Sequence, residues 1–213
     1  MTMTGCFHSG RWSKVLARRL QADERASQIA EFALSLPLLV VFVVGIFDFS
    51  GALALKQKLT NAAREGARVA AADPATDLTG GVTPVPVSVA DAFYVVDNYL
   101  KSENLNDCGL GTTPPTPSGT LTWSVTQNST GCPGVGIVFT INRGYYFPQT
   151  GGIAPTSACI PQTPSQTNAI GTCVSIKYAY KWRFNSVINL LVPSASYASV
   201  SYITTTATAF NEN

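Results

Sequence analysis

A 24-residue apolar run most limits what this chain of 213 residues can become. The run extends from Phe32 to Leu55 and contains a single charged residue, Asp48. Folded as an α-helix it measures about 36 Å, more than the hydrocarbon thickness of a bilayer, which is about 30 Å. The run therefore predicts one transmembrane helix. Pro37 falls near its start, where we expect a kink in the first turns with the remainder helical.

Asp48 is the one charge within the run. It lies about 24 Å along the helix from Phe32, close to the far interface of the bilayer. A carboxylate at that depth costs less than the value of about 3 kcal/mol at the bilayer centre. We interpret Asp48 first as an interfacial residue and second as a partner for a basic group on a neighbouring helix.

The helical pattern continues after the apolar run and predicts one long helix over about 27–72, ended by Pro74. Apolar and small residues recur at three-to-four spacing: Leu59, Ala62, Ala63, Gly66, Ala67, Val69 and Ala70. Within this set Ala62, Gly66 and Ala70 form a stripe that lets another backbone approach closely. The stripe fits a contact with another subunit, and it equally fits packing against the rest of this chain.

Charge is distributed unevenly along the chain. The leader, residues 1–26, has five basic and two acidic side chains, whereas the segment from Asp73 onward has five basic and seven acidic ones. Nucleic-acid binding requires clustered Lys and Arg, so we expect no nucleic-acid partner. Four further basic residues follow the span closely: Lys56, Lys58, Arg64 and Arg68. The positive-inside rule alone therefore leaves the orientation open.

Four of the five cysteines follow the apolar run: Cys108, Cys132, Cys159 and Cys173. They include no CxxC pair and have no histidine nearby, a pattern that favours disulfides over a zinc site. Three pairings are possible; we favour the sequential bridges, each of which stabilises by roughly 3 kcal/mol in the chain-entropy picture. Disulfides require an oxidising compartment, which predicts the leader in the cytoplasm and the following domain outside it.

The chain beyond the long helix divides into a linker and a head. Residues 73–87 are rich in Gly, Pro, Thr and Asp, which indicates the linker. A second helix is predicted to begin at Ser88, capped by its hydroxyl with Asp91 three residues on. The apolar face of this helix is Val89, Phe93, Val96 and Leu100.

Alternation of apolar and polar residues then predicts strands near 121–127, 135–142, 173–184 and 200–210. The fold class is therefore α+β: a long N-terminal membrane-spanning helix, then a small head, residues 88–213, with one helix packed on an antiparallel sheet of about four strands. The aromatic row Tyr178, Tyr180, Trp182 and Phe184 fits the core face of a strand better than a ligand platform. Residues 185–197 are apolar and either fill the core or form an exposed patch.

We expect no enzymatic activity, no cofactor, no metal and no small-molecule substrate. The single histidine, His8, lies in the leader, and the head has no GxSxG, no phosphate loop and no carboxylates at catalytic spacing. These absences leave no candidate catalytic residue. They favour a structural or binding protein.

Two strings give the chain a family resemblance. Ser27-Gln28-Ile29-Ala30-Glu31-Phe32 precedes the apolar helix, and Asn61-Ala62-Ala63-Arg64-Glu65-Gly66-Ala67-Arg68 follows it. Together they resemble the TadE-like proteins of tight-adherence (Flp) pili over residues 25–72. The resemblance implies a minor pseudopilin with a pilin-like head, used in pilus assembly and contributing to adhesion and biofilm formation. The second string, with Ala70 beyond it, is the motif that we expect to pack against other subunits.

The resemblance also implies processing on the cytoplasmic side by a prepilin peptidase. In this pattern the glutamate is the fifth residue of the mature chain, which places the cut between Ala26 and Ser27, with Glu31 and Phe32 following. The residue before the cut is usually glycine, whereas this chain has Ala26. Other implied partners are the membrane, pilin-like subunits and the pilus assembly platform.

Glu31 has two interpretations. The α-amino group freed at Ser27 can neutralise it, in the same or an adjacent subunit, and so fix axial register in a filament. Alternatively, Glu31 lies in a first helical turn, favoured by the helix dipole and wetted by lipid headgroups. The neighbouring motif favours the first interpretation.

A different class of protein is the alternative. Ala52-Leu53-Ala54 resembles a signal-peptidase site, which would release a secreted adhesive or binding module that begins at Leu55. An intact leader would instead make the chain a plain single-pass anchored protein. The basic leader, Glu31 and the continuous helical pattern favour the pseudopilin, in the bacterial inner membrane with its head in the periplasm or at the cell surface.

Overall fold

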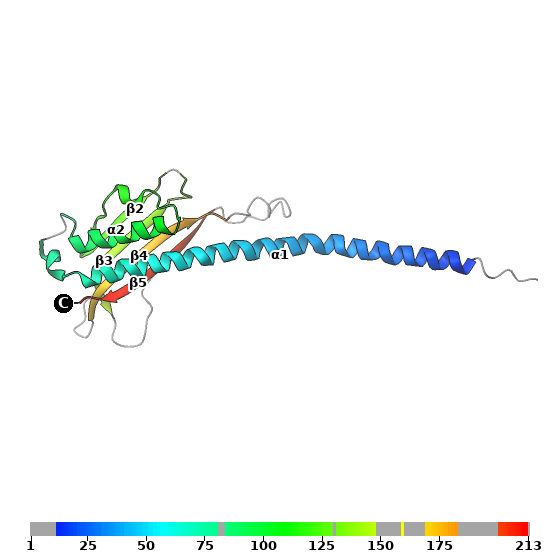
Figure 1. Ribbon diagram of the computed structural model, residues 1–213, viewed down its shortest axis with the longest axis horizontal. Helices are drawn as coiled ribbons and strands as arrows, with labels where there is room; N and C mark the ends of the chain where they lie inside the picture. Colours follow the sequence, from blue (N-terminus) through cyan, green and yellow to red (C-terminus); the bar gives the residue numbers. More distant parts are fainter. Residues whose placement is uncertain are drawn as a thin grey trace, which may run out of the picture.

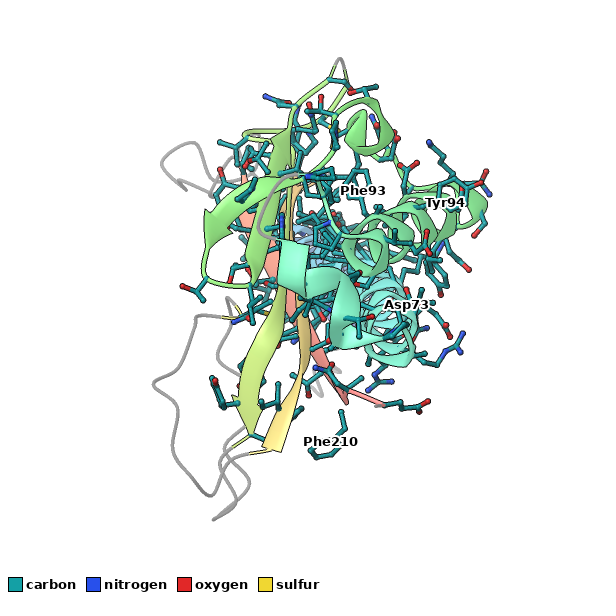
Figure 2. The ribbon with its side chains drawn as sticks, turned by 90° about the vertical axis from the view of Figure 1, so that its left-hand side faces the viewer. Asp73, Phe93, Tyr94 and Phe210 are labelled. Carbon is teal, nitrogen blue, oxygen red and sulfur yellow. A yellow bond between two sulfur atoms is a disulfide. The ribbon has the colours of Figure 1, made fainter. Side chains whose placement is uncertain are left out.

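The computed structural model describes residues 12–80, 84–129, 131–147, 159, 169–182 and 200–212, with side chains in the first helix from Ser27 onward. A long helix, α1 (Trp12–Ala72), extends from one end of a head in which it and α2 (Val87–Ser102) cover the same face of a β-sheet (Figures 1 and 2). The predicted α+β class and the long N-terminal apolar helix are confirmed. α1 begins earlier than the predicted residue 27, and Pro37 lies inside it with helix on both sides.

The sheet is an antiparallel meander of five strands in the order β1-β2-β3-β4-β5. The strands are β1 (Thr116–Gly119), β2 (Thr122–Gln127), β3 (Ile137–Phe147), β4 (Ala169–Tyr180) and β5 (Ser201–Phe210). The sequence predicts about four, and the additional strand is β1. Its four residues are all exposed, so they have no apolar alternation by which a strand is recognised.

Strand boundaries differ from the prediction around one bulge. The register of β3 with β4 shifts between Asn142 and Tyr145, so two residues of β3 oppose one of β4 and the alternation is broken there. For this reason β3 continues beyond the predicted end at 142. β4 correspondingly begins at Ala169, before the predicted 173, and ends at Tyr180. Residue 184, the predicted end of β4, lies outside the described residues, as does the apolar segment 185–197.

The second half of α1 belongs to the core of the head. Leu55, Leu59, Ala62 and Ala63 are buried there, as are Ala67, Ala70 and Ala71. At Gly66 a Cβ atom would stand 2.7 Å from Cγ2 of Val96 on α2, closer than carbon atoms normally approach. The stripe of small residues therefore lets α2 cross α1 at short distance within this chain.

The segment predicted as a linker contains a short helix, and the predicted start of α2 requires a correction. Residues 75–80 form a 3-10 helix, η1 (Ala75–Gly80), and α2 begins at Val87 with Pro86 as its N-cap residue. The prediction that Ser88 caps α2 is wrong. The backbone N–H of Ser88 instead donates to Oδ2 of Asp77, at 2.8 Å, so a carboxylate from η1 supplies an acceptor at the helix start.

The core lies between the two helices and the sheet. The predicted apolar face of α2 is confirmed, since all four of its members are buried: Val89, Phe93, Val96 and Leu100. Phe93 meets Phe139 of β3 edge to face at 5.6 Å between ring centroids, whereas Tyr94 points away from the sheet (Figure 2). Tyr178 and Tyr180 are buried and Trp182 packs against them, so these three aromatic residues form core and not a ligand platform.

Replacing Gly66 with valine tests the close crossing of α1 and α2. We expect Gly66→Val to lower the free energy of unfolding of the head by about 2 kcal/mol, because the added methyl groups collide with Val96. Thermal unfolding of the detergent-solubilised chain, followed by near-UV circular dichroism, measures the effect. Gly45→Val is the control, because nothing lies within 4 Å of a Cβ atom there. Equal stability of the two variants would contradict the packing.

Candidate functional site

The candidate site is α1, from the residues at the predicted cut to the junction with the head. From Ser27 to Phe47 no residue is buried, and the exposed side chains include Phe32, Leu34, Leu38, Leu39, Phe42 and Ile46. This part of α1 is the exposed span, and its 21 residues measure about 32 Å. Within the described residues, one helix is long and apolar enough to cross a membrane. α1 therefore supports a single-pass membrane anchor.

Asp48 is where the head begins to cover α1. Its side chain is 1% exposed, and the hydroxyl of Tyr180 donates to the backbone carbonyl of Asp48 at 3.3 Å. A Cβ atom at Gly51 would lie 3.1 Å from the same hydroxyl, so the end of β4 lies directly on the helix. The sequence places Asp48 near the far interface; the structure shows that protein covers its side chain.

The residues at the predicted cut lie on an uninterrupted helix. Ala26 is within α1, and Ser27, Glu31 and Phe32 are all exposed. No ion pair of Glu31 is present within the described residues. Glu31 therefore presents its carboxylate outward at the start of the exposed span.

The motif at 61–68 divides between two sides of α1. Ala62, Gly66 and Ala67 are buried in the head, and Ala70 beyond them is buried too. Asn61, Arg64 and Arg68 are exposed, and Glu65 is half-buried in an ion pair with Arg68 at 2.8 Å. The small residues thus pack inside this chain, and the polar residues are the part of the motif that a second subunit can reach.

Arg143 of β3, which the sequence analysis missed, fixes the end of α1. Its side chain is fully buried, and Nη1 donates to the carbonyl of Ala70 and, at 2.8 Å, to the hydroxyl of Thr172. Nη2 donates to the carbonyl of Asp73 at 3.0 Å. Asn211, after β5, accepts a bond from Thr172 at 2.7 Å and completes the network. One side chain therefore joins α1, β3, β4 and the C-terminal segment.

Electrostatics favour a cation at this place. Burial lowers the pKa of the Arg143 guanidinium, and the carboxylates of Asp77 and Asp73 oppose the shift. Arginine titrates so far above neutrality that it remains charged at pH 7. Its charge lies at the C-terminal end of α1, where the unpaired carbonyls and the helix dipole attract a cation. The sequence does contain a sign of this role, because Arg143 continues the series of alternate residues Ile137, Phe139 and Ile141 that face the core.

Two disulfides fasten loops to the sheet. Cys108 pairs with Cys132 across a Cα–Cα distance of 5.6 Å, and Cys159 pairs with Cys173 across 5.5 Å. These are the sequential bridges that the sequence analysis favours. The first joins the segment after α2 to the β2–β3 connection, and the second holds Cys159 on the outer face of β4, where Asn142 donates to its carbonyl at 3.1 Å.

Asp97 and Asp107, near the end of α2, are engaged structurally. Asp97, which is 4% exposed, forms an ion pair with Lys101 at 2.6 Å, and Lys101 also lies 3.5 Å from Asp107. Across the described residues no group of three His, Cys, Asp or Glu side chains is arranged to hold a metal ion.

The comparison with known proteins concerns α1. Residues 26–68 match the family model described as TadE-like protein. This segment is TadE-like. It runs from Ala26 to Arg68 and so includes both strings on which the resemblance rests, but it covers about a fifth of the chain. The match indicates a protein associated with tight-adherence pili. No curated protein and no solved structure matches the chain.

Replacing the Arg143 guanidinium with an apolar side chain tests its role at the C-terminal end of α1. We expect Arg143→Met to destabilise the head by about 3 kcal/mol, because the carbonyls of Ala70 and Asp73 and the hydroxyl of Thr172 lose their donor. The midpoint of thermal unfolding of the detergent-solubilised chain should fall by about 6 °C or more. Arg68→Met is the matched control, since Arg68 is an exposed arginine on α1 and a surface ion pair contributes at most about 1 kcal/mol.

Proposed function

We propose that this protein is a minor pseudopilin of tight-adherence (Flp) pili, and that it acts in pilus assembly and not in catalysis. The observation that carries the proposal is that the TadE-like segment is one continuous helix whose first part is exposed and apolar and whose second part is core of the head. Such a helix can hold a folded head at a membrane and present the same apolar surface to other helices. Adhesion and biofilm formation are then consequences of piliation.

Processing is the first step of the proposed function. A prepilin peptidase at the cytoplasmic face cleaves between Ala26 and Ser27, although the usual glycine is replaced by Ala26. The new α-amino group is a cation four residues from Glu31. Because Glu31 is exposed next to Phe32 at an apolar boundary, pairing with that amine in its own or an adjacent subunit neutralises a carboxylate that is otherwise costly to remove from water.

The head occupies the oxidising side of the membrane in this proposal. Its two disulfides favour the periplasm or the cell surface over the cytoplasm. The leader then lies in the cytoplasm, within reach of the peptidase and of the assembly platform. The exposed polar residues of the motif, Asn61, Arg64 and Arg68, face outward from the head and offer contacts to neighbouring pilin-like subunits.

The signal-peptide alternative receives less support. A cut before Leu55 would remove Asp48 and Gly51, which lie against Tyr180. It would also cut a helix whose next residues, Leu55 and Leu59, are core. An extended, accessible chain suits a signal peptidase better than a helix that packs on a folded head.

Neutralising Glu31 tests the role of the carboxylate. We expect Glu31→Gln to reduce incorporation into pili about tenfold or more, since loss of an interaction of about 1.4 kcal/mol changes an equilibrium tenfold. Pilus counts and the subunit content of sheared fibres measure this. Asp91→Asn is the matched control, because Asp91 is an exposed carboxylate on α2. Normal incorporation of the Glu31→Gln protein would refute the proposed pairing.

The N-terminus of the protein recovered from piliated cells separates the three topologies. We expect Ser27, the result of prepilin cleavage. A chain beginning at Leu55 would support a conventional signal peptide, and one that retains Met1 a plain anchored protein. Mass spectrometry of the intact protein also reports whether both disulfides are present.

A further inference from the structure

A shallow apolar hollow lies on α1 where the exposed span meets the head. Its described lining includes Phe42, Gly45, Ile46, Phe49 and Leu53, and its volume is about 540 Å³. Gly45 leaves space in this hollow, because nothing described lies within 4 Å of a Cβ atom placed there. The large side chains around it are 46–68% exposed, so this surface is apolar, concave and uncovered by the described part of the head.

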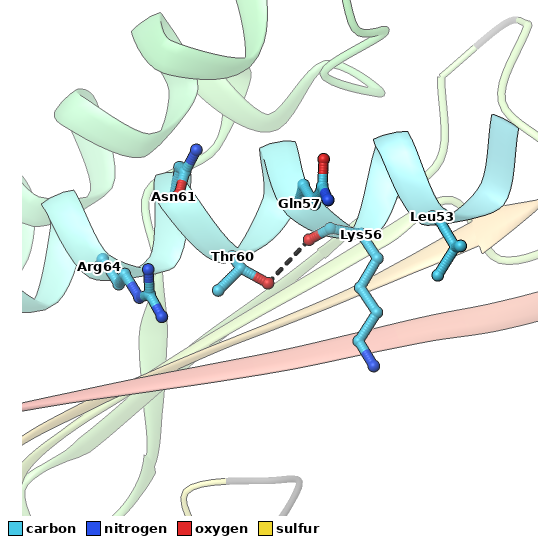
Figure 3. A pocket seen from close by; sticks show the side chains of 6 residues that line it. All are labelled: Leu53, Lys56, Gln57, Thr60, Asn61 and Arg64. Atoms are coloured by element: carbon cyan, nitrogen blue, oxygen red, sulfur yellow. Dashed lines mark hydrogen bonds between the residues drawn. The ribbon is translucent and has the colours of Figure 1, made fainter. Parts of the chain in front are cut away.

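A second hollow of about 400 Å³ continues on the same side of the helix, and Leu53 lines both. Its lining turns polar and basic, with Lys56, Gln57, Thr60 and Arg64 (Figure 3). Lys56, Thr60 and Arg64 extend to one side of α1 in this view. Within the described residues Lys56 has no ion pair, whereas Lys58, two residues on, is bound by Glu103 at 3.1 Å.

The two hollows lie at different depths in the membrane, and these depths indicate what each can bind. A hydrocarbon core of about 30 Å takes up about 20 helical residues, so a core that begins at Phe32 ends near Gly51. The apolar hollow then lies in the half of the bilayer next to the head. Lys56 lies about 7 Å beyond the hydrocarbon, within the headgroup layer, and Arg64 lies about 20 Å beyond it, outside that layer.

We propose that the apolar hollow and the adjoining Lys56 form a binding site for one anionic phospholipid of the leaflet next to the head, and that Arg64, at the far end of the second hollow, lies outside this site. An acyl chain lies along Phe42, Ile46 and Phe49 and over Gly45, and the phosphate is bound by the ammonium of Lys56. An anionic phospholipid matches this surface, because its acyl chain lies in the hydrocarbon next to the apolar hollow and its negative charge lies in the headgroup layer next to Lys56. A second pilin-like helix fits less well, because it would have to place a carboxylate at the depth of Lys56.

The site rests on the membrane anchorage in the proposed function and not on processing or pilus assembly. Lipid binding at this site would fix the position of α1 in the membrane. A lipid bound on this side of α1 stabilises the helix at one depth in the membrane and in one rotation about its axis. Extraction of the subunit from the membrane then requires release of this lipid.

Native mass spectrometry of the full-length chain, released from nanodiscs of phosphatidylglycerol and phosphatidylcholine, tests the proposal. We expect the wild type to retain phosphatidylglycerol over phosphatidylcholine, and Lys56→Gln to reduce that preference about fivefold. Lys58→Gln removes the same charge at similar depth on the other side of α1. Arg64→Gln removes a charge on the same side but farther from the membrane. Both controls should keep the preference.

The apolar half and the alternative occupant have separate tests. Gly45→Leu fills the hollow and should reduce retention of both lipids alike, with near-UV circular dichroism showing an unchanged head. A photoreactive residue at position 53, which lines both hollows, should yield an adduct of lipid mass in membranes. A protein adduct there, equal retention of the two lipids by the wild type, or an equal effect of Lys58→Gln would each overturn the site. None of these outcomes bears on piliation, which the Glu31→Gln experiment measures.

Discussion

One helix must serve both as an exposed apolar span and as part of the core of the head, and this requirement governs the structure. From Phe32 to Phe47 the surface of α1 is apolar and open, and from Asp48 onward one side of the same helix is core of the head. No break separates the two parts, since α1 is continuous from Trp12 to Ala72. The rotational phase of the helix therefore sets both which side meets the head and which side meets lipid. Packing in the head fixes the orientation of the span.

Arg143 closes the far end of this arrangement. A helix that ends inside a protein leaves carbonyl groups without donors, and here a guanidinium in β3 donates to the carbonyl of Ala70 in the last turn and to that of Asp73 just after the helix. Arg143 lies on the helix side because it continues the alternation of Ile137, Phe139 and Ile141, and the bulge then turns Tyr145 to the opposite face, beside Cys159 and Cys173. The bulge thus separates the cap of α1 on one face of the sheet from the packing of Tyr145 around the Cys159–Cys173 disulfide on the other.

Local pattern predicted the elements better than their contacts. The apolar run, the three-to-four spacing after it and the alternation in the strands are short-range signals, so α1, α2 and four of the strands follow from them. β1 has four exposed residues and no such signal. The acceptor at the start of α2 comes from Asp77, eleven residues before Ser88, and the cap of α1 comes from Arg143, far along the chain. A local sequence pattern cannot predict which distant residue will contact a helix end, because the two are brought together only when the chain folds.

The small residues of α1 show how packing decides between interpretations that a pattern leaves open. Ala62, Gly66 and Ala70 are used within the chain, so they are unavailable for a close contact with another subunit. The exposed span has the opposite property. Burial of each large apolar side chain contributes about 1.5–3 kcal/mol, and more than six such residues lie uncovered between Phe32 and Phe47. Because the described head covers none of them, lipid or other apolar helices must do so wherever the subunit goes. In the proposed function, movement from membrane to filament is therefore an exchange of one apolar covering for another, while the head remains folded on the second half of the helix.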